Sequence, residues 1–77
     1  MKVGDTVYFY LPKEFYDSDW VDGEARFGNT TLSLIDFLII KDLIGSEKTF
    51  TVVGLDCGNA SLEGLDGQWS LDLLVKV

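Results

Sequence analysis

Acidic and aromatic side chains alternate irregularly between residues 14 and 24, the stretch of this sequence best suited to recognition. Tyrosine and tryptophan supply contact area at interfaces, and carboxylates pair with arginine and lysine. This composition predicts a loop that binds a basic surface on a protein partner. The predicted contact residues are Tyr16, Asp17, Asp19, Trp20, Asp22 and Glu24. In the structural alternative, Phe15 and Trp20 fold back over the end of the core while the carboxylates are merely solvated.

Part of the same segment approximates the start of a calcium-binding loop. Asp17, Asp19 and Asp22-Gly23 follow the Asp-x-Asp-x-Asp-Gly pattern of an EF-hand, but with one residue too many. The glutamate expected at the twelfth position is replaced by Gly28. The sequence therefore predicts no metal site and no cofactor.

Catalytic groups are difficult to assemble from this chain. It has no histidine, so the usual proton shuttle near neutral pH is missing, and neither its serines nor Cys57 has a histidine base. No pair of carboxylates stands out for acid–base chemistry. The eight glycines are scattered at turns instead of forming a phosphate-binding loop. We therefore expect a protein that is not an enzyme.

Length and charge restrict the partners. The 77 residues predict one domain spanning residues 1–77. Thirteen acidic residues against six basic ones give a net charge of −7. Nucleic acids and anionic membranes attract clustered lysine and arginine, so we expect neither direct nucleic-acid binding nor membrane association. A protein with a basic surface is the expected partner, although solubility alone also explains such a charge.

The expected location is the cytoplasm. Met1-Lys2 is followed by Val3-Gly4-Asp5 and not by the apolar region of a secretory signal. The densest apolar run, Leu32–Ile44, is interrupted by charged residues and is too short to cross a bilayer. Cys57 is the lone cysteine, which fits a reducing compartment.

Strands are predicted where β-branched and aromatic residues alternate between turn residues. Tyr8 and Tyr10 alternate with more apolar neighbours in a strand at residues 3–11, which Pro12 ends. Further strands are predicted at residues 47–55, 60–65, 68–70 and 75–77. Their connections are predicted to be a turn at Cys57-Gly58-Asn59, a hairpin turn at Asp66-Gly67 and a 3-10 turn at residues 71–74.

The middle of the chain is less regular. Residues 13–29 lose the apolar periodicity, and we expect a long excursion with a helical turn near 13–16 and a short strand at 24–27. Asp22-Gly23 and Gly28-Asn29 are turn signals.

Residues 30–44 fit two structures. One is a helix with Ser33 as N-cap, Asp36 in the first turn and Gly45 just after the end. The other is a strand at residues 31–40 followed by a turn at 41–46, which the β-branched residues favour. We prefer the strand, because the other predicted strands need partners.

The sequence resembles small SH3-like barrels at both ends. The residues that carry the resemblance are Val3-Gly4-Asp5-Thr6-Val7 and the closing stretch Asp66–Val77, with its aromatic Trp69, short turn and apolar strand. The resemblance implies an all-β fold: a small SH3-like barrel of about five strands, with a long acidic–aromatic loop and at most one short helix. It does not extend to the peptide-binding motif of signalling SH3 domains, whose Pro and Tyr in the one-turn helix are replaced by Leu71-Asp72-Leu73.

These features together predict a protein-binding module that engages a basic protein surface through its acidic–aromatic loop. A small acidic domain of this kind would suit an accessory protein of a phage or mobile element. The alternative is an acidic inhibitor that mimics nucleic acid and occupies the phosphate-binding groove of an enzyme. A homodimer through Leu32–Ile44 is a further expectation, because that run has more apolar residues than one face of a small barrel buries.

Overall fold

The computed structural model describes residues 1–28 and 30–77, and its structure is mainly β with one helix of 12 residues. The strands are β1 (Thr6–Phe9), β2 (Glu24–Phe27), β3 (Thr30–Ser33), β4 (Thr49–Asp56), β5 (Asn59–Leu62), β6 (Leu65–Ser70) and β7 (Leu74–Lys76). The helices are α1 (Lys13–Tyr16) and α2 (Leu34–Gly45), together with the 3-10 turns η1 (Val21–Gly23) and η2 (Leu71–Leu73).

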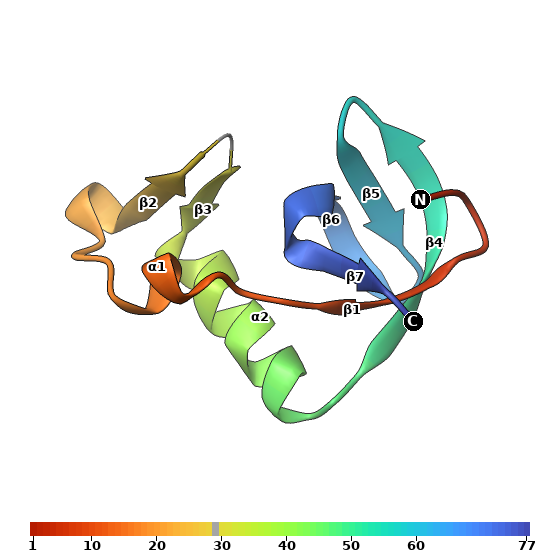
Figure 1. Cartoon of the computed structure of the whole chain (residues 1–77), viewed down its shortest axis with the longest axis horizontal. Coiled ribbons are helices and arrows are strands. Elements are labelled where there is room, and N and C mark those ends of the chain that lie inside the picture. Colours follow the sequence, from red (N-terminus) through yellow and green to blue (C-terminus); the bar gives the residue numbers. More distant parts are fainter. Residues whose placement is uncertain (29) are drawn as a thin grey trace.

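The strands form two antiparallel sheets. The larger one has five strands in the order β6-β5-β4-β1-β7, and the smaller one pairs β2 with β3. Although β6 and β7 are the outer strands of the large sheet, they are consecutive in the chain and are joined by η2. Figure 1 shows the small sheet and α1 at one end of the molecule and the strands of the large sheet at the other. The predicted all-β fold is confirmed in part: the described chain is mostly strand in antiparallel sheets, but it has seven strands and a helix of 12 residues.

The core is formed by the buried side chains that alternate with exposed ones along the strands. In β1, Val7 and Phe9 are buried while Tyr8 is exposed, as period-two patterning requires. Val52 of β4 and Ala60 of β5 are fully buried on the same core. Ile40 of α2 is fully buried in it as well, so the helix closes a part of the core that the sheets leave open.

The preferred strand at residues 31–40 is wrong, and the helical alternative is correct. The strand β3 ends at Ser33, whose Oγ accepts a hydrogen bond from the Asp36 N–H at 3.1 Å and caps α2. The helix then buries Phe37 and Ile40. Tertiary packing of this kind overrides the β preference of isoleucine, which costs a helix only a few tenths of a kcal/mol per residue. Gly45 is the last residue of α2 and not the residue after it.

The predicted hairpin turn at Asp66-Gly67 is also wrong. The β5–β6 turn lies at Glu63-Gly64, between the paired Leu62 and Leu65. Because the next pair joins Ser61 to Gln68, Asp66 and Gly67 form a bulge inside β6. Gly67 has the positive φ that was predicted for it, +88°, but the residue lies in the bulge and not in a hairpin turn.

The turn predicted at residues 41–46 is absent, because α2 continues to Gly45. The turn predicted at Cys57-Gly58-Asn59 is present. Cys57 and Gly58 have φ of 47° and 83° and connect β4 to β5, the backbone of a type I′ hairpin. The short strand predicted at residues 24–27 and the helical turn at 13–16 are both present, as β2 and α1. The predicted turn at Gly28-Asn29 includes Asn29, which lies outside the described residues.

In the described part of the chain, no helix combines the length and the hydrophobicity that crossing a bilayer demands.

Candidate functional site

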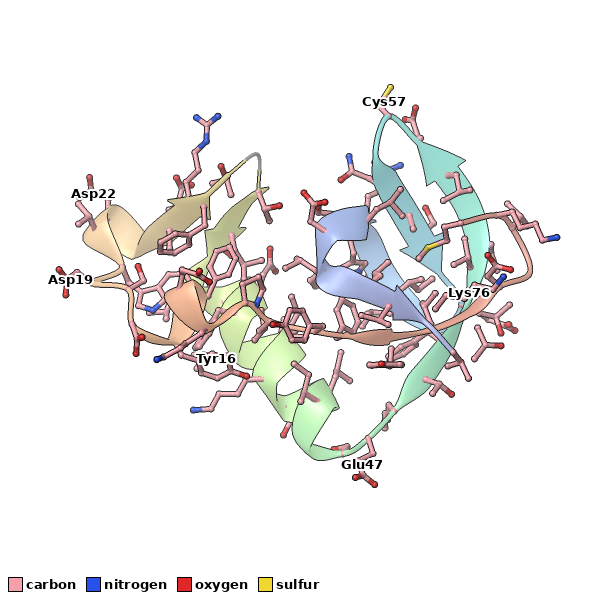
Figure 2. The ribbon with its side chains drawn as sticks, viewed as in Figure 1. Tyr16, Asp19, Asp22, Glu47, Cys57 and Lys76 are labelled. Carbon is pink, nitrogen blue, oxygen red and sulfur yellow. The ribbon has the colours of Figure 1, made fainter. Side chains whose placement is uncertain are left out.

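The predicted contact residues lie on one continuous part of the molecule, from the end of α1 to the start of β2. Tyr16 ends α1, Asp17 follows as its C-cap residue, and Glu24 begins β2. Asp17, Asp19, Asp22 and Glu24 are all exposed. Figure 2 shows Asp19 and Asp22 projecting outward at the end of the molecule farthest from the five-stranded sheet.

These carboxylates have no basic partner within reach. In the described part of the chain the single salt bridge joins Asp5 to Lys76, so none of the four carboxylates belongs to one. The same residues do not gather into a group of three that could hold a metal ion, as judged over residues 1–28 and 30–77. Their negative charge therefore faces solvent and is open to an external cation.

The backbone between α1 and β2 separates the acidic side chains from the aromatic one. Trp20 and Asp22 both have left-handed φ, 47° and 54°, which is uncommon outside glycine. Ser18 Oγ accepts a hydrogen bond from the Trp20 N–H at 3.2 Å, and the Trp20 carbonyl accepts one from the Gly23 N–H at 3.1 Å. These turns direct Asp19 and Asp22 outward while Trp20 packs inward.

Trp20 is half-buried in an aromatic cluster. Its ring centroid lies 4.7 Å from that of Phe37 and 6.3 Å from that of Phe15, which is fully buried. Phe15 in turn packs edge-on against Phe27 at 4.9 Å. The alternative prediction, in which both rings fold back over the end of the core, is therefore correct for Phe15 and for the buried part of Trp20. The exposed part of the predicted site consists of Tyr16 and the four carboxylates.

A groove of about 530 Å³ lies beside Tyr16, and the sequence analysis did not identify it. It contains all three tyrosines of the chain. Tyr8, Tyr10 and Tyr16 are 42%, 53% and 46% exposed. The complete lining is Tyr8, Phe9, Tyr10, Leu11, Tyr16, Ile44, Glu47, Lys48 and Thr49.

The groove forms where two chain segments separate. The ladder between β1 and β4 ends at the pair Tyr8–Thr49, and the connection from α2 to β4 then leaves β1. On the β1 side, the Tyr10 N–H donates to the Leu73 carbonyl at 2.8 Å, which holds this segment against η2. On the α2 side, Glu47 has a left-handed φ of 54° and its N–H donates to the Ile44 carbonyl at 3.0 Å.

Tyr16 joins the groove to the acidic segment. Its ring packs edge-on against Phe37 of α2, with centroids 5.5 Å apart, and its remaining surface lines the groove. Tyr16 is thus the one predicted contact residue that belongs to both surfaces. The sequence signal for the other two tyrosines is their alternation with apolar residues between Val7 and Leu11, which predicts that Tyr8, in β1, and Tyr10, just after it, both face outward.

A third surface feature is the outward side of α2. Within the run expected to form a homodimer, Leu32, Phe37 and Ile40 are buried in the chain's own core. The exposed apolar residues of α2 are Leu34, Ile35, Leu38 and Ile39.

Comparisons with protein-family models, with curated proteins and with solved structures find no match to this chain.

Proposed function

We propose that this protein is a non-enzymatic protein-binding module and that its acidic segment, residues 14–24, engages a basic surface on its partner. The observation that carries the proposal is the set of four exposed carboxylates outside any salt bridge in the described chain, next to the half-exposed Tyr16. Charge-assisted contacts from arginine or lysine would satisfy the carboxylates, and the tyrosine would supply an aromatic anchor.

Trp20 has a supporting role in this proposal. Its contacts with Phe37 and Phe15 fix the base of the segment, so the carboxylates are presented on a packed support. Preorganisation of this kind lowers the entropy lost on binding.

We also propose that the fold is an SH3-like barrel with a long insertion between its first two strands. Two observations support this. The outer strands β6 and β7 are continuous through the one-turn η2, and β7 pairs with β1 at Val7–Lys76, Tyr8–Val75 and Phe9–Leu74. The segment from α1 to α2 would then be the insertion, and it contains the acidic segment. We place the protein in the cytoplasm, which suits the exposed thiol of Cys57.

The proposed function is tested by charge-neutral substitution at the site and at a matched set elsewhere. The site variant carries Asp17→Asn, Asp19→Asn, Asp22→Asn and Glu24→Gln. The control carries Asp42→Asn, Asp56→Asn, Glu63→Gln and Asp66→Asn, which are also exposed and change the net charge by the same amount. Each tagged protein is used to capture partners from a lysate of its source cells at low and at high salt.

We expect the native protein and the control variant to retain a common basic partner that the site variant loses. Retention should weaken at high salt, because exposed ion pairs are screened. Equal capture by the site variant would overturn the proposal. Equal loss from both variants, with a nucleic-acid enzyme as the partner, would favour the alternative of a nucleic-acid mimic, which depends on charge spread over a whole face.

A further inference from the structure

We infer that the three-tyrosine groove is the docking site for an extended, basic segment of the same partner. Apolar side chains of that segment would occupy the groove, and its lysine or arginine side chains would lie toward Tyr16 and the acidic segment. This inference rests on the proposed function, because it takes the partner to be basic.

The size and lining of the groove suit a peptide segment. A volume of about 530 Å³ is in the range of pockets that enclose small ligands or a few side chains. Phe9 and Leu11, which are almost fully buried, contribute to its lining together with Ile44. The polar lining residues are consecutive, from Glu47 to Thr49, so they border the groove on one side. Apolar side chains of a ligand would therefore gain most of the binding free energy.

The tyrosines provide orientation and specificity. Among the described residues, none of the three phenolic hydroxyls takes part in a hydrogen bond with the protein. All three are therefore available to a ligand backbone or side chain. Their ring faces also attract the ammonium or guanidinium group of a basic residue.

Charge selects a basic occupant over an acidic one. Glu47 and Lys48 on the border of the groove offset each other, while Tyr16 is followed directly by Asp17 and the rest of the acidic segment. With a net charge of −7, the whole chain repels an acidic peptide. The groove includes no residue of η2, so it differs from the site that signalling SH3 domains build partly from their one-turn helix.

The probes are three synthetic twelve-residue peptides that alternate leucine with arginine, leucine with glutamate, or serine with arginine. Each is titrated into the isotope-labelled full chain, and the backbone amide shifts are mapped by NMR. We expect the leucine–arginine peptide to bind and to shift amides at residues 8–11 and 44–49. The serine–arginine peptide should bind at least about tenfold more weakly, and the leucine–glutamate peptide should not bind.

A groove variant and a matched control complete the test. Tyr10→Ala removes an exposed ring, and we expect it to weaken the leucine–arginine peptide about tenfold, as loss of an aromatic anchor does. Val53→Ala shortens a side chain of similar exposure on β4, outside the groove, and should leave binding unchanged. Amide spectra of both variants confirm that they are folded.

Equal binding of the leucine–arginine and serine–arginine peptides would overturn the inference, as would an unaffected Tyr10→Ala variant or shifts confined to α2. The charge-neutral site variant separates this inference from the proposed function. If that variant binds the leucine–arginine peptide as tightly as the native chain does, the groove stands and the role of the acidic segment fails. If the peptide shifts only residues 14–24, the acidic segment stands and the groove fails.

Discussion

Thr30 Oγ1 donates a hydrogen bond to Asp72 Oδ2 at 3.0 Å, and this contact links the small sheet to the large one. Thr30 begins β3 and is buried, whereas Asp72 lies in η2, between β6 and β7. The Ser70 hydroxyl in turn accepts a hydrogen bond from the Asp72 N–H at 3.2 Å. The three residues therefore hold the segment that carries the candidate site against the closing part of the chain.

Replacing Thr30 with valine should lower the free energy of unfolding by roughly 1–2 kcal/mol. Valine keeps the shape of the side chain, so the loss reports the hydrogen bond that the Asp72 carboxylate accepts. Thr31→Val is the matched control, because Thr31 is the next residue of β3 and is exposed. Urea unfolding of both variants measures the difference. If the two lose the same free energy of unfolding, the bond between Thr30 and Asp72 contributes nothing to stability.

Asp5 is a nearly buried carboxylate just before β1. The Lys2 N–H donates to its Oδ2 at 2.9 Å, and Lys76 Nζ lies 3.6 Å from its Oδ1. The hydrogen bond from Lys2, with the nearby Lys76 ammonium, lowers the pKa of Asp5 below its ordinary value of 3.8, although burial acts in the opposite direction. The interaction ties the start of the chain to the end of β7.

A lowered pKa in the folded state means that Asp5 stabilises the protein when it is ionised. Its contribution should be fully present above the unfolded pKa and should be lost as the pH falls through the folded one. We expect Asp5→Asn to lower the free energy of unfolding at pH 7 and to differ less from the native chain as the pH drops below 3.8. Urea unfolding across this range measures it. A deficit in Asp5→Asn that does not change with pH would refute the ionic role.

The outward side of α2 should mediate self-association at high protein concentration. Leu34, Ile35, Leu38 and Ile39 form an exposed apolar surface on a helix that is apolar on nearly all sides, a pattern typical of helices that are covered. Leu38→Glu should therefore reduce dimer formation in sedimentation equilibrium. Val53→Glu has the matched exposure, 52% against 53% for Leu38, and should not reduce it. If the native chain stays monomeric at millimolar concentration, the prediction that α2 mediates self-association is wrong.

Much of the local structure could be predicted, and the errors have a common cause. The turn at Cys57-Gly58 and the 3-10 turn η2 lie where they are predicted, because each depends on a few adjacent residues. The first strand is shorter than predicted: β1 covers Thr6–Phe9 and not residues 3–11. Residues 34–45 and the pair Asp66-Gly67 were assigned wrongly. In both, local preference was compatible with two structures, and packing decided between them. As parts of α2, Phe37 and Ile40 are buried in the core, and in β5 Ser61 pairs with Gln68, so Asp66 and Gly67 lie inside β6 and not in the turn.

The candidate site divides in the same way. The acidic segment, the net charge of the chain and the outward direction of Tyr8 could all be predicted, because they follow from residue type and from the two-residue period of a strand. The tertiary structure alone decided that Trp20 packs inward and that Tyr8, Tyr10 and Tyr16 line one groove. Such arrangements depend on contacts between residues that are distant in the chain, as between Tyr16 and Phe37 or Tyr8 and Thr49, and residue type alone does not predict those contacts.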